Sequence, residues 1–598
     1  MRKAEAVLGI ISERGTKGLH LEDVYRQLYN PALYLDAYGR LYRNEGAMTR
    51  GATKETVDGM SQGKIETIID ALCQERYRWT PVKRVYIPKA NGKMRPLGIP
   101  TWSDKLLQEV MRSILNAYYE PQFSRRSHGF RPGRGCHTAL TEVFYSWKSV
   151  KWFIEGDIKG CYDNIDHEIL LSSLCERIHD GRFIELVRRL LKAGFLEDWN
   201  YRSTYSGVPQ GGVVSPILAN IYLDQLDRFV ENVLIPRYTR GSKRGTNASW
   251  KKMSKLACQL KKGGRMDEWK EARKLMRSFP CSDTADPDFR RLYYIRYADD
   301  FLLGFSGPRA EAEAIKADIR QYLQQQLRLE MSEEKTLITH ARTELARFLG
   351  YEIAVMDSKS RRSVNGQIEL RVPADVVDKV CKRYEQKGRP AHRRVMAHSS
   401  DFDIVAAYGM EYRGVVQYYK LARNIHDLSR VHWVMRTSLL RTLANKHHSS
   451  ARKMWRKYKS TTITPDWTKL KCLQVVINRD EQGKPALVAT FGGIPLRRDM
   501  KATLVDERGP GTSICTTRTE IIQRLLAGRC EICDSTDKME VHHVRKLTDL
   551  AKPGRRAKPY WMQLMAARKR KTLVVCGKCH NDIHAGRLDG RPKGAPTE

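Results

Sequence analysis

The sequence lacks any apolar run that approaches the ~18 consecutive residues of a membrane-spanning helix. Arg2 and Lys3 stand near its start, but the apolar stretch from Ala6 to Ile11 is too short to be the core of a secretory signal. Internal repeats, a glycine-rich nucleotide loop and a long low-complexity linker are also absent. We therefore expect a chain that is neither secreted nor bound to a membrane.

Acidic residues are scarce relative to basic ones. Among 598 residues, 106 are Lys or Arg and only 68 are Asp or Glu, which gives a formal net charge of +38. An excess this large, spread over the whole length, predicts a polyanionic partner, and a large nucleic acid fits better than a small anion. Hydrophobic residues make up 41% of the chain, enough for the cores of several globular domains.

Disulfides are not expected, although the sequence contains 13 cysteines. An odd number spread through a large chain is typical of free thiols in a reducing compartment. Near the C-terminus, however, four cysteines form two Cys-x-x-Cys pairs: Cys530, Cys533, Cys576 and Cys579. Two such pairs supply four thiolates for tetrahedral zinc, and a small basic segment needs a bound metal to hold its fold together. We predict a structural Zn²⁺ site there.

Two adjacent carboxylates lie between two short apolar runs, in the motif Tyr297-Ala298-Asp299-Asp300. The pattern predicts two β-strands joined at the acids, so that Asp299 and Asp300 project from a tight hairpin. Like charges this close repel each other unless cations neutralise them, and oxygen ligands select Mg²⁺. The alternative is a solvated turn, because Asp-Asp is common in loops.

A third acid favours the metal site. Asp157 ends the mostly apolar run that begins at Trp152, which predicts a buried strand, and an amphipathic helix with Leu170, Leu174 and Ile178 on one face follows. An acid in an apolar strand must be paired or bound to a metal. Asp157, Asp299 and Asp300 together can hold two Mg²⁺ ions, as in the sites that catalyse in-line phosphoryl transfer.

These acids resemble those of the reverse transcriptases, whose palm carries one Asp on a first strand and a Tyr-x-Asp-Asp hairpin. Further blocks occur in the order of that family: 88–98, 127–132, 206–212, 334–336 and 348–351. The resemblance implies that Lys89 and Arg95 hold the nucleotide triphosphate. It also implies that Tyr162 excludes a ribose 2′-hydroxyl and that Gln210 lies near the incoming dNTP.

More narrowly, the chain resembles the bacterial group II intron-encoded proteins. The N-terminal blocks 29–31, 44–49 and 58–59 match that family's extension, and 414–422 and 439–447 match its thumb, the maturase region. The resemblance implies an RNA-directed DNA polymerase that binds its cognate intron RNA, promotes splicing and cleaves double-stranded target DNA during intron mobility. It also implies a bacterial cytoplasmic location, associated with the nucleoid when DNA is bound; an organellar location stays open.

The expected fold is an α+β multidomain chain with a right-hand reverse transcriptase, a helical thumb, a small DNA-binding segment and a zinc-stapled ββα-metal unit. We expect fingers and palm with an N-terminal extension at 1–366, the thumb or maturase domain at 367–465, the DNA-binding segment at 466–520 and an HNH endonuclease domain at 521–598. The insertion between 227 and 291 is rich in Lys and Arg. It is either an RNA-contacting arm or a solvated helical face.

The thumb region interleaves cations with aromatic rings between Arg441 and Tyr458. Such a mixture is typical of RNA contact, because bases stack on rings while cations bind phosphates. The alternative is that the rings, Trp455 and Tyr458, belong to the core.

Within the C-terminal unit lie His542-His543 and His580-x-x-x-His584. A spacing of four on a helix places His580 and His584 on one face, as metal ligands require. The set resembles the HNH endonucleases, which implies that His543 is the general base and that His542, His580 and His584 bind the nuclease's divalent ion, Mg²⁺ being expected. No Asn occurs between Arg545 and Val575, where the family's middle Asn lies. A DNA-binding module without cleavage is therefore the alternative.

Two other functions compete with the multifunctional enzyme. One is an RNA-binding splicing cofactor with an inactive polymerase or nuclease; the intact Asp157, Asp299 and Asp300 disfavour an inactive polymerase. The other is a reverse transcriptase of a defence or diversity-generating element, which the maturase-like thumb and the HNH-like tail disfavour.

Overall fold

The structure is a computed structural model. It describes residues 3–88, 92, 94–197, 200–202, 204, 206–208, 211–283, 286–356, 366–396, 398–479, 485–505, 516–547, 550 and 558–588. Within these ranges, no helix combines the length and the apolar character needed to cross a membrane.

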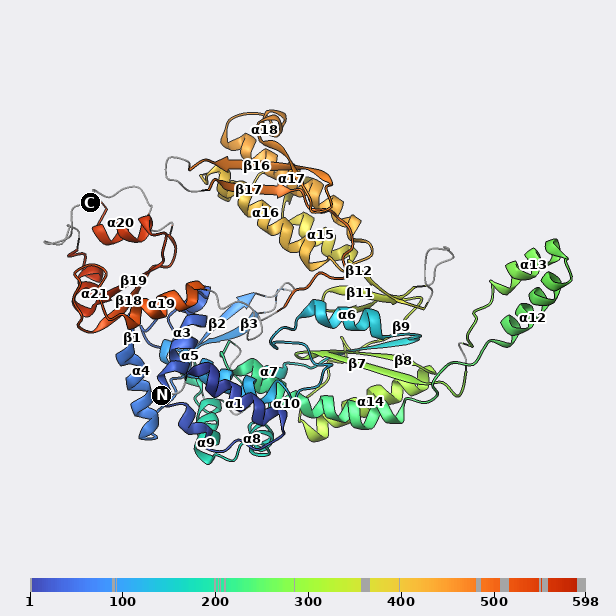
Figure 1. Cartoon of the computed structure of the whole chain (residues 1–598), viewed down its shortest axis with the longest axis horizontal. Coiled ribbons are helices and arrows are strands. Elements are labelled where there is room, and N and C mark those ends of the chain that lie inside the picture. The colour runs from blue at the N-terminus through green and yellow to red at the C-terminus, as the bar shows by residue number, and fades with distance from the viewer. Residues whose placement is uncertain are drawn as a thin grey trace.

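A four-stranded sheet lies at the centre of the molecule (Figure 1). Its order is β7-β8-β4-β9, with the bounds β4 Trp152–Asp157, β7 Arg291–Tyr297, β8 Asp300–Ser306 and β9 Ile338–His340. All pairings are antiparallel, and β4 pairs with β8 and β9 on its two sides. The predicted strand before Asp157 and the predicted hairpin around Asp299 are confirmed.

Each face of this sheet packs against a different layer. Alternate side chains of a strand point to opposite faces, so Ile154 and Leu303 contact one core while Phe153 and Leu302 contact another. The first core is shared with α10 (Ser215–Phe229) and α14 (Arg309–Gln326), and the second with α6 (Cys136–Ser146). The sheet is thus buried on both faces, which fixes the ends of its strands.

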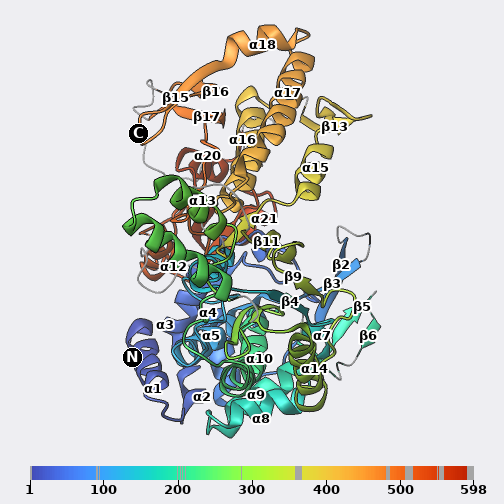
Figure 2. The same cartoon turned by 90° about the vertical axis from the view of Figure 1, so that its right-hand side faces the viewer.

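The N-terminal helices and those beside β4 pack around the long helix α5 (Figures 1 and 2). Their bounds are α1 Ala4–Thr16, α2 Val24–Gln27, α3 Pro31–Leu41, η1 Glu45–Met48, α4 Gln62–Cys73, α5 Trp102–Tyr119, α7 Cys161–Asn164, α8 His167–Cys175 and α9 Gly181–Leu191. The amphipathic helix predicted after Asp157 is confirmed as α8.

A second four-stranded sheet, of order β3-β2-β5-β6, lies beside this helical layer. Its strands are β2 Val82–Pro88, β3 Met94–Ile99, β5 Phe195–Glu197 and β6 Asn200–Arg202. β2 pairs antiparallel with β3 along its whole length and parallel with β5 at its start.

The basic insertion folds into a helical hairpin that projects from the right-hand end of the molecule in Figure 1. It follows α10, a π-helical turn η2 (Val230–Leu234) and α11 (Ile235–Arg237), and consists of α12 (Ala248–Lys262) and α13 (Met266–Met276). The hairpin has a small core of its own, made of Ala257, Leu260 and Ala272.

A helical module stands above the central sheet in Figure 1, on a small sheet of order β10-β11-β12. Its elements are β10 Ala346–Phe348, β11 Tyr351–Val355, β12 Ile368–Arg371, α15 Ala374–Lys382, β13 Glu385–Gln386, β14 Arg389–Pro390, η3 Arg394–Met396, α16 Asp401–Tyr418, η4 Ile425–Asp427, α17 Leu428–Lys446 and α18 Ala451–Tyr458. The helices share one core with the second face of the central sheet.

A three-stranded antiparallel sheet, β15-β16-β17, closes this module. Its strands are β15 Lys459–Ile463, β16 Lys469–Ile477 and β17 Leu487–Gly492. The sheet packs on α16: a Cβ at Gly409 would lie 2.1 Å from the Thr490 carbonyl oxygen. The sheet thus spans the boundary expected at 465.

The C-terminal unit combines α19 (Thr516–Leu526), β18 (Met539–His543), α20 (Tyr560–Ala567), β19 (Thr572–Cys576) and α21 (Gly577–His584). β18 and β19 pair antiparallel, and α21 follows β19 directly. A third strand in this sheet, β1 (Met60–Ser61), comes from the N-terminal region. The unit is therefore joined to the N-terminal helices by backbone pairing, near the left of Figure 1.

Candidate active sites

Three carboxylates meet at one end of the central sheet. Asp157 is the last residue of β4 and stands opposite Asp300, the first residue of β8, in the antiparallel register. Asp299 lies in the turn between β7 and β8, beside Ala298, whose φ of 54° is left-handed. The structure thus brings together the three acids that the sequence predicts, from two strands and one turn.

The cluster carries more negative charge than its surroundings neutralise. Burial, followed by the neighbouring Asp299 and Asp157 carboxylates, raises the pKa of Asp300 to about 7. Burial and Asp157 also raise the pKa of Asp299. Lys335 Nζ lies 2.8 Å from Asp157 Oδ2. Crowded acids with raised pKa values favour bound cations, and a set of carboxylate oxygens suits Mg²⁺.

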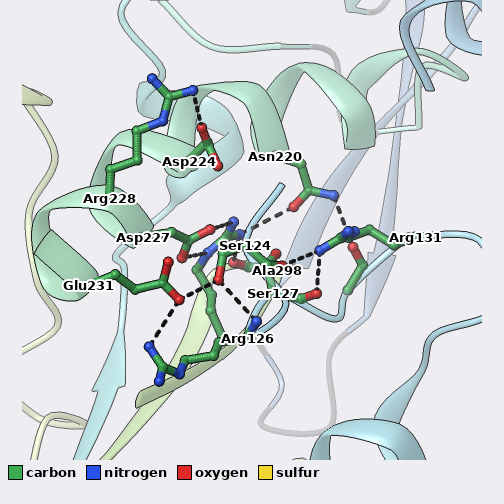
Figure 3. Close-up of polar contacts among 12 residues, drawn as sticks. Ser124, Arg126, Ser127, Arg131, Asn220, Asp224, Asp227, Arg228, Glu231 and Ala298 are labelled. Carbon is green, nitrogen blue, oxygen red and sulfur yellow. Dashed lines mark hydrogen bonds and ion pairs between the residues drawn. The ribbon is translucent and has the colours of Figure 1, made fainter. Parts of the chain in front are cut away.

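A buried ion pair holds the turn that carries Asp299. Arg296 and Asp227 are fully buried, with Arg296 Nη2 2.6 Å from Asp227 Oδ2. Arg296 also donates from Nη1 to the Ala298 carbonyl at 2.8 Å and to Asn220 Oδ1 at 3.2 Å (Figure 3). The guanidinium therefore connects α10 to the backbone of the turn itself, and we assign it as a positioning residue.

The block 127–132 supports the same turn from outside. His128 donates its backbone N–H to the Arg296 carbonyl at 2.9 Å. A Cβ at Gly129 would lie only 2.4 Å from Ala298 N, so any larger residue would displace the turn. Arg131 is buried and donates to the Ser124 and Ser127 carbonyls (Figure 3). The block is one of those that resemble the reverse transcriptases, and its role in supporting the turn is not evident from the sequence.

We expect Arg296→Met to cost about 3–5 kcal/mol of stability, because it leaves the Asp227 carboxylate buried without its cation. Arg126, whose side chain is 39% exposed and bonds Glu231 at 3.1 Å, provides the matched control (Figure 3). Arg126→Met should cost no more than about 1 kcal/mol. Unfolding of the two variants in urea, monitored by the polymerase activity that remains, measures both losses of stability. Equal losses in the two variants would contradict the positioning role.

Of the four residues expected to bind the nucleotide, the structure describes Arg95 and Tyr162. Arg95 lies on β3 near enough to Asp299 to lower the pKa of that carboxyl, against the larger effect of burial. Tyr162 lies on α7, and burial together with Asp299 raises the pKa of its hydroxyl. Both thus lie near the acid cluster. Lys89 and Gln210 lie outside the described residues.

The segment before Gln210 is tied to the Tyr162 turn. Val208 donates its backbone N–H to the Tyr162 carbonyl, and Gly207 donates to the Ile165 carbonyl, both at 2.8 Å. Gly207 has φ 87°, and a Cβ there would lie 2.7 Å from the Tyr162 and Asp163 carbonyl oxygens. Only glycine fits this position without strain.

The four predicted zinc cysteines converge at the C-terminal unit. The sulfur atoms of Cys530, Cys533, Cys576 and Cys579 all lie within 4.8 Å of one another. Cys533 and Cys576 Sγ are 3.6 Å apart, close to the edge of about 3.8 Å of a tetrahedron with Zn–S bonds near 2.3 Å. Two backbone N–H groups, of Cys533 and Cys579, donate to Cys530 and Cys576 Sγ. The geometry fits zinc.

The three histidines predicted to bind the nuclease ion also converge. His542 comes from β18, and His580 and His584 come from one face of α21; their ligand atoms lie within 4.8 Å of one another. His580 Nδ1 lies 2.5 Å from Glu540 Oε2, a contact that orients its ring. A carboxylate that the sequence pattern did not predict joins them as a fourth potential ligand: Asp58, from the N-terminal region.

His543, the residue expected to act as general base, faces the protein interior. Its Nε2 lies 3.0 Å from the Tyr38 hydroxyl of α3, and its ring is edge-on to that of Tyr38. Burial lowers the pKa of its imidazole to about 3. In this arrangement His543 is neutral and covered by the N-terminal helices.

The fold and these sites define a class of protein that acts on phosphodiester bonds, with one acidic and one histidine-rich centre. Residues 87–353 match the family described as reverse transcriptase (RNA-dependent DNA polymerase). Residues 375–491 match type II intron maturase, and residues 530–580 match AI2M/AI1M-like, HNH endonuclease.

Similar proteins match most of the chain. The chain is 36% identical to group II intron-encoded protein LtrA of Lactococcus lactis subsp. cremoris, over 98% of this chain and 99% of that protein. It is 34% identical to an uncharacterized 91 kDa protein in a cob intron of Schizosaccharomyces pombe, over 94% of this chain and 69% of that protein. It is also 31% identical to protein YkfC of Escherichia coli, over 61% of this chain and 90% of that protein.

The chain belongs to the group II intron-encoded proteins. It is a multifunctional member that joins an RNA-directed DNA polymerase, a maturase and an HNH endonuclease in one polypeptide.

Proposed function

We propose that Asp157, Asp299 and Asp300 hold the two Mg²⁺ ions of the polymerase. The observation that carries this proposal is the register of β4 and β8, which sets Asp157 opposite Asp300 and leaves Asp299 beside them. These carboxylates would hold magnesium where its charge would stabilise the attacking and leaving oxygens of an in-line phosphoryl transfer. Lys335 donates from Nζ to Asp157 Oδ2 and places a positive charge beside the cluster.

The residues around the acids select and orient the nucleotide. Arg95 presents a planar guanidinium that can bind a phosphate through two hydrogen bonds, and Lys89, from the same sequence block, adds a point charge. Tyr162 fills the space beside Asp299 and excludes a ribose 2′-hydroxyl. Gln210 lies after the segment that is bonded to the Tyr162 turn and contacts the incoming dNTP.

The partner in splicing is the cognate intron RNA, bound by the helical module as a thumb. The cations Arg452, Lys453, Arg456 and Lys457 are exposed along α18. Tyr458 is buried and belongs to the core, whereas Trp455 is half-buried and lies under Arg436. Counterion release from the RNA makes such binding tight and sensitive to salt.

The insertion acts as a second RNA contact. Its basic residues on α12 and the following turn are all exposed: Lys251, Lys252, Lys255, Lys261, Lys262 and Arg265. The hairpin projects from the body of the protein, so its cations can reach a phosphate backbone away from the polymerase site (Figure 1). We further propose that residues 466–520 contact the double-stranded target DNA.

The nuclease cleaves one strand of that DNA. His542, His580 and His584 would hold a divalent ion that stabilises the leaving oxygen when bound. His543 would take a proton from the attacking water, once its ring leaves the Tyr38 hydroxyl. The buried position of His543 supports a second candidate, a zinc-stapled DNA-docking module that does not cleave.

The RNA that the chain retains on purification tests the proposed partner. We expect sequencing to find one structured intron RNA strongly enriched over its cellular abundance. The double variant Lys453→Ala/Lys457→Ala should lose much of this RNA, because it loses two phosphate contacts. Each lost contact should lower the slope of log affinity against log salt concentration by about one. The control Lys571→Ala/Lys578→Ala removes two exposed cations of the C-terminal unit and should retain the RNA. Retained RNA that mirrors bulk cellular RNA would contradict the proposal.

A further inference from the structure

A segment of the N-terminal region reaches into the nuclease site. Gly59 donates its backbone N–H to the Val541 carbonyl at 3.0 Å, and β1 pairs with β18 through Met60 opposite Val541 and Ser61 opposite Glu540. The contact is a packed one, because Val57 and Met60 are fully buried. The C-terminal residues Ile521, Leu525, Val541 and Val574 belong to the same core as α1, α3 and α5.

This pairing places the carboxylate of Asp58 among the three histidines. Asp58 Oδ1 lies 3.4 Å from His542 Nδ1 and 3.3 Å from His580 Nε2, while Oδ2 lies 2.8 Å from His584 Nε2. His580 and His584 Nε2 are 3.2 Å apart. A tetrahedron with ligand bonds of about 2.1 Å has edges of about 3.4 Å, so these separations match the shell of one ion.

The donor set is that of a closed site. Three imidazole nitrogens and one carboxylate oxygen suit a borderline ion such as Zn²⁺ better than Mg²⁺, which prefers oxygen ligands. Structural zinc sites have four protein ligands, whereas catalytic ones keep a position open for water or substrate. With Asp58 in place, a tetrahedral ion has no open position for a DNA phosphate.

The same segment covers the proton acceptor. His543 donates its backbone N–H to Asp58 Oδ1 at 2.8 Å, and its ring lies against Tyr38. The N-terminal region therefore contacts both the ion's ligands and the residue that would activate water. Carboxylate and phosphate oxygens are both anionic ligands, so a phosphate can replace Asp58 at the ion.

We propose that Asp58 is the fourth ligand of the nuclease ion and closes this site until a phosphate of the target DNA takes its place. Its second half, the displacement of Asp58 by DNA, rests on the proposed nuclease function. Its first half concerns ion binding alone and is tested without DNA.

Zinc binding by the full-length chain tests the ligand role. We expect wild-type protein to hold one zinc at the four cysteines and a second at Asp58 and the histidines, measured by elemental analysis after dialysis against a competing chelator. Asp58→Asn, which keeps the side-chain shape, should weaken the second zinc at least about tenfold and leave the first bound. Asp36→Asn is the control, because that acid lies on α3 and is 44% exposed. Equal affinity in all three chains would overturn the ligand role.

Nicking of supercoiled target DNA tests the closure. At saturating Mn²⁺, Asp58→Asn should nick faster than wild type, because its site is already open, while Asp36→Asn should match wild type. Primer extension by each variant checks that the chain is folded. Slower nicking by Asp58→Asn at saturating ion would overturn the closure. If no chain nicks DNA at any ion concentration, the proposed nuclease is overturned and the closure with it. The ligand role of Asp58 is decided by the zinc measurement alone.

Discussion

Asp299→Ala is expected to abolish primer extension on an RNA template, with a loss of about 10⁴-fold or more, the scale found when one member of a catalytic unit is removed. Asp299 lies close enough to Asp157 and Asp300 for their charges to interact, so its loss removes oxygen ligands from the proposed metal site. Steady-state extension with dNTPs and Mg²⁺ measures the effect.

The variant should remain folded. Burial and the neighbouring Asp157 raise the pKa of Asp299, which shows that the folded protein disfavours its charged form. Removing the carboxylate relieves this repulsion. Asp267→Ala, at a side chain that is 95% exposed on α13, is the control and should extend primers at the wild-type rate. Substantial cDNA synthesis by Asp299→Ala would refute the assignment of the acids.

Cys576→Ser is expected to remove the structural zinc and to abolish DNA nicking while primer extension continues. The apolar core around the four cysteines is small, and structural zinc contributes about 10–16 kcal/mol of apparent binding energy in comparable small units. Without it, the region from Cys530 onward should lose its packing. Elemental analysis and limited proteolysis measure the two effects.

The control for this variant is Cys175→Ser, at an exposed cysteine of α8 that lies outside the zinc cluster. It should keep its zinc, its resistance to protease and both activities. Full zinc content and normal nicking in Cys576→Ser would show that these cysteines do not hold the unit together.

The parts of the sites that the sequence predicts are those encoded by local pattern. An apolar run that ends at Asp157 reads as a buried strand, and apolar runs on both sides of Asp299 read as a hairpin. The spacing of His580 and His584 places them on one helical face. Each of these features depends on residues close together in the sequence, so each could be found before the fold was known.

Contacts between distant segments could not be predicted in this way. Asp227 lies on a helix with other polar residues, and nothing in its neighbourhood shows that Arg296 would neutralise it. The position of Arg296 gives a weak indication of a buried ion pair, because a cation within an apolar strand needs a partner. Asp58 was noticed only as part of an N-terminal block, and its approach to His542 depends on the pairing of β1 with β18.

The central claim is that one chain carries separate surfaces for intron binding and for polymerisation, and splicing by Asp299→Ala tests it most directly. The variant keeps every exposed cation of α18 and of the α12–α13 hairpin. We expect it to promote splicing of the cognate intron at low Mg²⁺ at the wild-type rate, although it makes no cDNA. Loss of splicing together with loss of polymerisation, in a variant that is still folded, would contradict the claim.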